Sequence, residues 1–209
     1  STWISAILVR LKRKPVFFWT MGWRRPESGL KKAIRNTFYA IANQLMLYGD
    51  MGKDLGIKQG FSASKIKVVY NSVTDLEEID WSSNGIAKKP DAIGAVGRLN
   101  EVKKLPLLLE AVSILQSRGI NLKLILAGPG PEKEKLEARA SNLGIDCFFW
   151  GAIYEPEEIA KFYKNVKVTV IPAAIGLTAI QSLAYGVPVI TDDGDFDHGP
   201  EVDAIVSGL

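Results

Sequence analysis

Arg98 and Lys103 are the side chains whose type and spacing best suit phosphate chemistry in this sequence. They follow an apolar run at 92–96 that predicts a buried strand, and they precede a helical pattern. Ligands of doubly wound sheets lie beyond the carboxyl ends of the strands, so both cations are expected beside one ligand. Two cations there can hold a pyrophosphate and stabilise the charge that develops when it leaves. A solvated loop explains them too, since Lys-Lys pairs are common at helix starts.

Glycine residues follow two of the predicted strands. Gly97 comes directly after the first, and Gly128 and Gly130 come after the next one. Glycine lets the backbone approach a ligand closely, and Pro131 suits the first position of a helix. The pattern is shorter than the dinucleotide-binding fingerprint, and a plain strand-to-helix turn explains it about as well.

The stretch from Gly176 to Gly186 carries the strongest signal. It lies between two apolar strand patterns, and we expect a helix that begins at Gly176 and ends at Gly186. A turn of small residues at a helix start exposes unpaired backbone N–H groups at the positive end of the helix dipole, which suits an anion. Gly176, Leu177 and Thr178 are therefore candidate ligands of a diphosphate.

A regular alternation of strands and helices positions these residues. Strands separated by helices of about 10–15 residues imply right-handed crossovers and a parallel sheet. A polar stretch between 73 and 90 reads as a connector, so we expect domains at 1–74 and 91–209 and a linker at 75–90. In the second domain, strands are expected at 92–96, 122–127, 147–150, 166–171 and 187–191, and helices at 105–117, 131–143, 156–163 and 177–185.

The first domain predicts a smaller set of the same elements. A buried strand is expected at 67–70 and a short strand at 45–48, and a buried strand at 16–19 is one of two interpretations of that segment. Helices are expected at 27–43 and 51–58. Helical spacing places one apolar face on the first of these helices, made of Leu30, Ile34, Phe38, Ile41 and Leu45.

In this order, the motifs resemble the donor-nucleotide segments of the retaining glycosyltransferases of the GT-B fold, in particular family 4. The resemblance is strongest over about residues 92–191. It implies an α/β fold of two Rossmann-like domains in GT-B arrangement, with the first domain partial and the second a doubly wound parallel sheet. The chain would then be a fragment of a longer protein. The matching segments are Gly97-Arg98-Leu99 with Lys103, Gly128-x-Gly130-Pro131-Glu132, and Gly176-Leu177-Thr178 ahead of Gly186-x-Pro188.

The resemblance also implies roles for single residues. Arg98 and Lys103 match the family's cations at the leaving diphosphate. Family members usually have two Glu residues near the donor, but Ala173 and Gln181 stand in their places, and Gln181 keeps only uncharged groups for the ribose. The other donor positions are Ala152 and Ile153 at the nucleobase and Glu201 near the sugar, and the acceptor-side positions are Gly22 and Asn71.

The activity implied is that of a hexosyltransferase. It would move a sugar from a nucleoside diphosphate sugar, of UDP or GDP type, to a hydroxyl of a glycan or lipid-linked acceptor in surface polysaccharide or glycolipid synthesis. The nucleotide sugar is a substrate, and no cofactor is expected. Two alternatives stay open: a nucleotide-sugar epimerase, and a catalytically silent nucleotide- or glycan-binding module. Loss of both family Glu residues favours the silent module, and turnover of the donor would separate it from the enzymes.

Charge is unevenly distributed along the chain. Residues 1–36 hold nine Lys or Arg against one acid, whereas the whole chain carries a net charge of +3. Basic residues among Trp and Phe suit an anionic membrane surface or a phosphate-bearing acceptor, although a buried strand with solvated flanks explains them equally. No nucleic-acid motif accompanies the charge, so no nucleic-acid partner is expected. The lone Cys147 suits a reducing compartment, and we expect a cytoplasmic protein peripheral to the inner face of the membrane.

An acidic run follows the last predicted strand. Asp193, Asp195 and Asp197 alternate with other residues, and such clustered carboxylates can hold Mg²⁺ or Mn²⁺. In the GT-B pattern, cations from the protein take the place of a metal, so no metal site is expected. His198 is the only histidine, and we expect it to be an inert residue of a surface loop.

Overall fold

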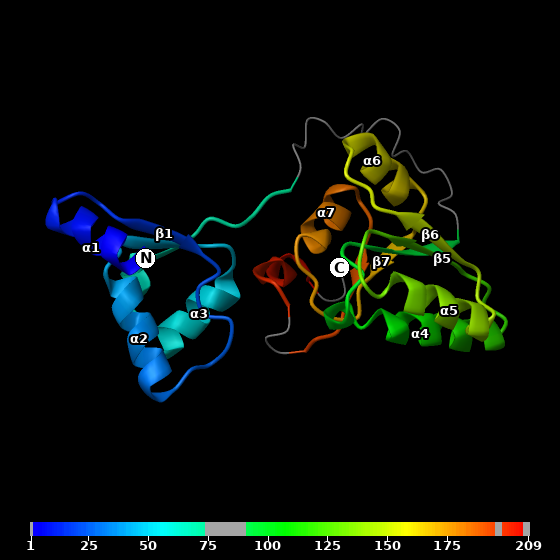
Figure 1. Cartoon of the computed structure of the whole chain (residues 1–209), viewed down its shortest axis with the longest axis horizontal. Helices are drawn as coiled ribbons and strands as arrows, with labels where there is room; N and C mark the ends of the chain where they lie inside the picture. Colours follow the sequence, from blue (N-terminus) through cyan, green and yellow to red (C-terminus); the bar gives the residue numbers. More distant parts are fainter. Residues whose placement is uncertain (1, 74–90, 195–197, 207–209) are drawn as a thin grey trace. The chain divides into compact units, whose positions relative to one another are not determined.

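The computed structural model describes residues 2–73, 91–194 and 198–206, and it divides into two compact units (Figure 1). The first unit extends to Asn71 and also includes Val206, and the second is Ser72–Ile205. The linker expected at 75–90 lies outside the described residues, so the expected domain limits stay predictions.

The second unit contains a five-stranded sheet with the order β6-β5-β4-β7-β8, in which every neighbouring pair is parallel. The chain runs outward from β4 to β6 and then returns to the other side of β4. The winding therefore reverses between β4 and β7, and this is the topological switch point at which such sheets bind ligands. The strands are β4 (Ala92–Val96), β5 (Lys123–Ala127), β6 (Cys147–Gly151), β7 (Val168–Val170) and β8 (Val189–Ile190).

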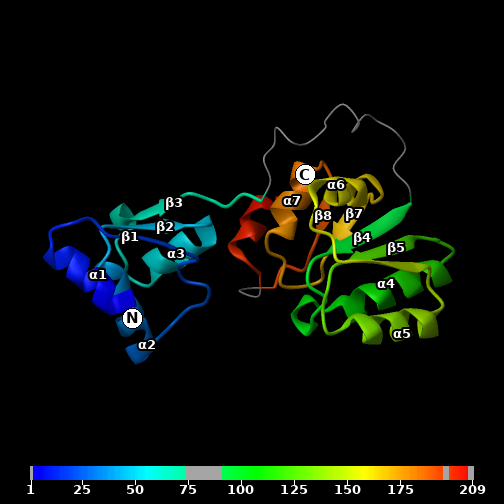
Figure 2. The same cartoon turned by 45° about the horizontal axis from the view of Figure 1, so that its top comes forward.

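Helices cover both faces of this sheet, with α4 and α5 on one face and α6 and α7 on the other (Figures 1 and 2). The expected α/β fold with a parallel sheet is confirmed. Several boundaries differ: the helix expected from Gly176 begins at Thr178, and the strands expected at 166–171 and 187–191 are shorter, at Val168–Val170 and Val189–Ile190. The helices are α4 (Leu105–Ser117), α5 (Lys133–Leu143), α6 (Pro156–Lys164) and α7 (Thr178–Ala184), with short 3₁₀ turns η4 (Glu101–Lys103) and η5 (Pro200–Ala204).

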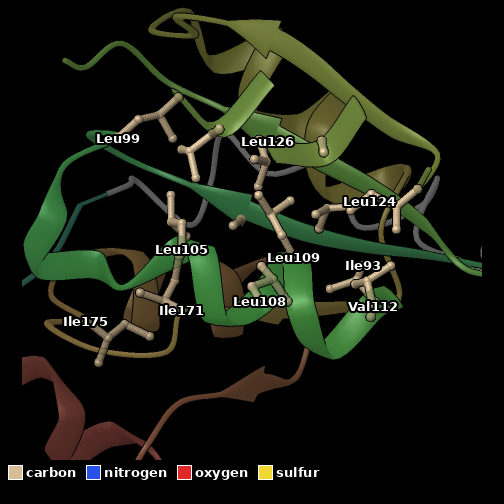
Figure 3. Packing of buried hydrophobic residues seen from close by; sticks show 14 of the residues in the cluster. Ile93, Leu99, Leu105, Leu108, Leu109, Val112, Leu124, Leu126, Ile171 and Ile175 are labelled. Carbon is tan, nitrogen blue, oxygen red and sulfur yellow. The ribbon is translucent and has the colours of Figure 1, made fainter. Parts of the chain in front are cut away.

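The central strand β4 is buried along its whole length. Its side chains alternate between two apolar clusters, as expected of a strand covered on both faces. Ile93 belongs to the cluster that contains Leu109 of α4 (Figure 3), and Ala92 belongs to the cluster that contains Phe162 of α6. Gly94 allows α6 to pack closely, because a Cβ there would lie 2.7 Å from Cζ of Phe162. This rigid layer holds the loops at the carboxyl ends of the strands.

The first unit contains a three-stranded sheet with the order β1-β2-β3, and both pairs are parallel. No helix among the described residues is both long and apolar enough to cross a membrane. The elements are α1 (Thr2–Leu11), β1 (Phe17–Thr20), α2 (Gly29–Ala40), β2 (Gln44–Leu47), α3 (Asp50–Lys58), η1 (Ala63–Lys65) and β3 (Ile66–Val68).

Burial in the first unit differs from the expectation. The strand expected to be buried at 67–70, and the one for which burial was an alternative at 16–19, are the outer strands of the described sheet, so Trp19 of β1 remains 63% exposed and Lys67 of β3 is exposed. The buried strand is the central β2, where Leu45 and Leu47 have no exposed surface. Burial therefore follows position in the sheet more than the apolar character of each segment.

The helices of the first unit also depart from the apolar pattern. On α2, Leu30 and Ile34 of the expected apolar face are exposed, and the buried residue is Tyr39. Helix α1 was not expected, because its apolar residues follow one another without a polar face. Within α1 only Ala6 is buried.

Candidate functional site

A pocket of about 460 Å³ lies at the carboxyl ends of β4, β5 and β6. Residues from three separate loops line it, and five of them were predicted from the sequence. Three further lining residues were not predicted: Val96 directly precedes a predicted one, and Pro129 and Tyr154 each directly follow one. The predicted lining residues are Gly97, Arg98, Gly128, Gly130 and Ile153.

The floor of this pocket is made of backbone. A Cβ at Gly128 would lie 1.9 Å from the carbonyl oxygen of Gly97, and one at Gly130 would lie 2.0 Å from that of Leu99. The N–H of Leu99 donates to the carbonyl of Pro129 at 2.8 Å. The loops after β4 and β5 therefore contact each other backbone to backbone, and only glycine leaves room for this approach.

The two predicted cations have different surroundings. Arg98 is exposed at the edge of the pocket, whereas Lys103 is half-buried in the turn before α4. Nζ of Lys103 donates to the carbonyl of Ala174 at 2.8 Å, so it joins the loop after β4 to the loop after β7 across the switch point. Burial lowers the pKa of Lys103, and the nearby charge of Glu201 opposes this effect.

Thr178 lies beside the same loop. Its hydroxyl donates to the carbonyl of Val96 at 3.1 Å, which ties the start of α7 to the end of β4. A Cβ at Gly97 would lie 3.6 Å from this hydroxyl and 4.0 Å from Cε of Lys103. Gly97, Lys103 and Thr178 are thus close together, although the Thr178 hydroxyl expected at a diphosphate is used within the protein.

The segment after β8 packs on the loop 173–176. The N–H of Gly199 donates to the carbonyl of Ile175 at 2.7 Å, and the N–H of Ile175 donates to Nδ1 of His198 at 3.2 Å. Nε2 of His198 lies 2.6 Å from a carboxylate oxygen of Asp192. His198 is only 4% exposed, so the expectation of a surface histidine is wrong. His198 is buried because the segment after β8 packs on this loop, and the sequence alone does not show this packing.

Glu201 is also buried in this segment, at 7% exposed. A Cβ at Gly176 would lie 3.8 Å from its Oε2 atom, so the carboxylate adjoins the predicted donor loop. Among the described residues, no group of three or more His, Cys, Asp or Glu could hold a metal ion. Asp195 and Asp197 lie outside the described residues.

Ala173 and Gln181, which stand where family members usually have Glu, offer different groups to a ligand. Ala173 is 1% exposed and offers a ligand no polar side chain. Oε1 of Gln181 accepts from the hydroxyl of Tyr163 at 3.2 Å, and burial raises the pKa of Tyr163, which keeps that donor protonated. The amide N–H groups of Gln181 are then the ones suited to a ligand. Leu177 and Ala152 are both exposed.

The two predicted acceptor-side residues belong to the first unit. Gly22 is buried in a left-handed conformation with φ 73°, directly after β1. Its carbonyl accepts from Tyr39 and Arg35 of α2, each at 3.4 Å. Asn71 ends the N-terminal segment of this unit and is half-buried.

Known proteins match this chain over much of its length. The family model described as "Glycosyl transferases group 1" matches residues 77–198, more than half of the chain. The Bacillus subtilis protein named "Putative glycosyltransferase EpsF" is 27% identical over 205 residues. That match covers 91% of this chain and 52% of EpsF, so the chain spans about half the length of this relative.

Solved structures share the fold. The Anabaena protein Alr3699/HepE in complex with UDP matches with a TM-score of 0.74 at 18% identity, covering 99% of this chain and 60% of HepE. The lipopolysaccharide outer core galactosyltransferase WaaB matches with a TM-score of 0.71 at 23% identity, covering 99% of this chain and 58% of WaaB. The expected membership of the GT-B fold class is thereby confirmed.

Proposed function

The chain belongs to the group 1 glycosyl transferases, and on this basis we propose that it transfers a sugar from a nucleoside diphosphate sugar to a hydroxyl acceptor with retention. One observation carries the proposal. The pocket at the carboxyl ends of β4, β5 and β6 gathers Gly97, Arg98, Gly128 and Gly130. It lies at the sheet edge on which doubly wound folds bind ligands, and the loop after β4 joins it to the switch point between β4 and β7. The HepE structure contains UDP, which supports a donor of UDP type, with GDP as the other candidate.

The chemistry needs charge stabilisation more than a strong acid or base. The bond between the anomeric carbon and the diphosphate oxygen breaks, and a bond to the acceptor oxygen forms on the same face of the sugar. The hydroxyl proton passes to the leaving diphosphate. Arg98 and Lys103 stabilise the negative charge that develops on this group, and a site that excludes water strengthens their effect. Lys103 is already partly desolvated in the described structure.

Other groups position the donor in this proposal. The backbone of Gly176 and Leu177 faces the diphosphate together with Thr178. Ile153 and Ala152 lie at the nucleobase, and the amide of Gln181 binds the ribose. The buried carboxylate of Glu201 adjoins the loop 173–176 at Gly176, and we assign it to the sugar hydroxyls.

The acceptor is proposed to be a glycan or a lipid-linked glycan of a surface polysaccharide or glycolipid. The name of WaaB, a lipopolysaccharide outer core galactosyltransferase, supports this class. Helix α1 supports a location at the cytoplasmic face of a membrane, because Ile4, Leu8 and Leu11 are exposed close to basic residues. Gly22 and Asn71 are assigned to the acceptor side.

Calorimetric titration of the 209-residue chain with UDP, GDP and ADP, with and without EDTA, tests the donor site. We expect one diphosphate to bind without metal, and the Arg98→Ala, Lys103→Ala double variant to weaken binding at least tenfold. Arg118→Ala, Lys164→Ala is the matched control, because both cations are exposed in the same unit outside the pocket. Equal binding by both double variants, or no binding at all, would overturn the donor-site assignment.

A second candidate function is a silent nucleotide-binding module. Ala173 favours it, because this buried methyl group replaces an acid that family members usually carry near the donor sugar. The transferase and the module are distinguished by whether the bound donor releases its nucleoside diphosphate. This release is measured with and without a lipid extract that contains acceptors. Tight binding without release in either case would support the module and contradict the transferase.

A further inference from the structure

The side chain of Tyr163 in α6 contacts Gln181 of α7, and the two helices cover the same face of the sheet (Figure 1). Tyr163 is 1% exposed. It belongs to the apolar cluster that also contains Val96 and Ile153, and these two residues line the pocket at the carboxyl ends of β4, β5 and β6. The cluster that holds Tyr163 therefore forms part of the wall of the pocket to which we assign the donor.

The ring of Tyr163 is fixed by its neighbours. It stacks on the ring of Tyr185 at 4.8 Å and meets Phe162 edge-on at 5.1 Å. Its hydroxyl donates to Oε1 of Gln181 at 3.2 Å, and Gln181 is its one partner among the described residues. Burial raises the pKa of Tyr163, so the hydroxyl keeps its proton. A buried donor without an acceptor costs free energy, so the carbonyl end of the Gln181 amide is held toward Tyr163.

Gln181 lies on the face of α7 that meets the end of β4. Thr178 precedes it by three residues, which places both on one face of the helix, and the Thr178 hydroxyl donates to the carbonyl of Val96. The side chain of Gln181 is half-buried. Its Nε2 atom has no partner among the described residues. Two N–H groups at the end of β4 are thus available to a ligand.

An amide needs this orientation, whereas a carboxylate does not. The two ends of an amide differ, since the carbonyl accepts and the NH₂ group donates, but both oxygens of a carboxylate accept. A Glu at position 181, which family members usually carry, would offer an acceptor to the ribose whichever way it turned. Gln181 offers a donor only while its carbonyl faces away from the ligand. Tyr163 makes this choice, because its hydroxyl proton requires the carbonyl.

We propose that Tyr163 is a positioning residue, which turns the N–H groups of Gln181 toward the ribose so that the site selects ribonucleoside diphosphates over their deoxy forms. The inference rests on the proposed function, because it requires a nucleotide in the pocket. The ribose oxygens accept from Nε2 of Gln181, which is the reverse of the bond that a carboxylate would make. Tyr163 itself does not touch the nucleotide.

Calorimetric titration of the 209-residue chain with UDP and with 2′,3′-dideoxy-UDP tests the inference. The guanosine pair replaces them if GDP is the diphosphate that binds. We expect wild type to bind UDP about tenfold more tightly than the dideoxy form, the effect of one or two hydrogen bonds. Tyr163→Phe should lower this ratio by about threefold or more, with the affinity for the dideoxy form unchanged.

Ser182→Ala is the matched control, because it also removes a buried hydroxyl beside Gln181. Oγ of Ser182 bonds to the hydroxyl of Thr169 at 2.7 Å and donates to the carbonyl of Val187 at 2.9 Å. Its loss should destabilise the second unit but leave the ratio of the two affinities as in wild type. A ratio that falls equally in Ser182→Ala and Tyr163→Phe would overturn the proposal, since loss of packing would then explain both.

A Gln181→Glu background separates orientation from structure. Tyr163→Phe should leave the ratio unchanged there, because either carboxylate oxygen can accept from the ribose hydroxyls. The same fall in both backgrounds, or no fall beside Gln181, would contradict the positioning role. Gln181→Ala should lower the ratio as Tyr163→Phe does, and a retained ratio in Gln181→Ala would contradict the ribose contact.

Failure of the proposed function gives a different result. If wild type binds neither diphosphate, the donor-site assignment is overturned and this inference with it. If wild type binds UDP and its dideoxy form equally, the donor site stands and the selection by Gln181 and Tyr163 is overturned alone.

Discussion

The backbone N–H of Ile175 donates to Nδ1 of His198 at 3.2 Å. Because Nδ1 accepts, the neutral ring carries its proton on Nε2, which lies 2.6 Å from the carboxylate of Asp192. At the preceding residue of the loop, Nζ of Lys103 donates to the carbonyl of Ala174. Ala174 has a left-handed backbone with φ 51°, a conformation that costs energy for any residue except glycine. Two side chains therefore hold a strained loop at the proposed donor site.

His198→Ala should destabilise the second unit and weaken diphosphate binding. The substitution leaves the buried N–H of Ile175 without an acceptor, at a cost of about 1–3 kcal/mol. His198→Asn keeps an oxygen near the place of Nδ1 and should restore part of the stability, whereas His198→Gln places its oxygen near Nε2 and should restore less. Urea unfolding measures the stability of the three variants, and equal stability of all three would contradict the role of Nδ1.

Lys104→Gly should stabilise the protein by about 0.5–1 kcal/mol. Lys104 has a left-handed backbone with φ 50°, and glycine removes this strain at some cost in unfolded-state entropy. The 4.0 Å ion pair with Asp192 is exposed and contributes little. Lys104→Ala is the control, because it also removes the ion pair but keeps the strain. A thermal midpoint that rises equally in both variants would show that strain is not the cause.

Glu27 should contribute to stability in a pH-dependent way. Hydrogen bonding and charge from Arg35 lower its pKa below the ordinary value of 4.5. Its contribution is therefore present above pH 4.5 and is lost as the pH falls through the lowered folded value. Wild type and Glu27→Gln should differ most in urea unfolding near pH 7 and converge at acidic pH. Asp54→Asn, an exposed acid of the same unit, should show no such convergence.

Cys147 should be unreactive in the folded protein. Burial, with the charges of Asp146 and Glu137, raises the pKa of its thiol to about 12, so little thiolate exists at neutral pH. The side chain packs against the apolar cluster under α4 and α5. A thiol reagent at pH 7.5 should label the protein slowly, and labelling should become fast in urea. Fast labelling without urea would contradict this interpretation.

The pocket at the ends of β4, β5 and β6, to which we assign the donor, was predicted best where its lining is backbone. Gly97, Gly128 and Gly130 were identified because strand ends of a parallel sheet share one edge, and the described pocket contains all three. Side chains whose role depends on contacts with residues far away along the chain were not identified. His198 contacts Ile175 only because the chain folds back after β8, and no local pattern signals that contact.

The first unit was predicted less well for a related reason. Apolar segments at 16–19 and 67–70 look like core strands, but their burial depends on which neighbours the sheet supplies. Glu27 appeared only as the single acid of a basic segment. Its pairing with Arg35 requires α2 to face the loop after β1, and this is a tertiary relationship.

The glycine contacts at Gly128 and Gly130 have a practical consequence for mutational mapping. Alanine scanning usually tests a residue by removing side-chain atoms. The floor of the pocket consists of peptide groups and has no side chain to remove, so a scan of this kind does not detect it. Sensitivity there is to added atoms: one methyl group at either position meets a carbonyl oxygen about 2 Å away, 1.9 Å at Gly128 and 2.0 Å at Gly130. In random libraries scored for tolerated substitutions, Gly128 and Gly130 would be the least tolerant positions of the site. Neither residue has a functional side-chain group that would explain this intolerance.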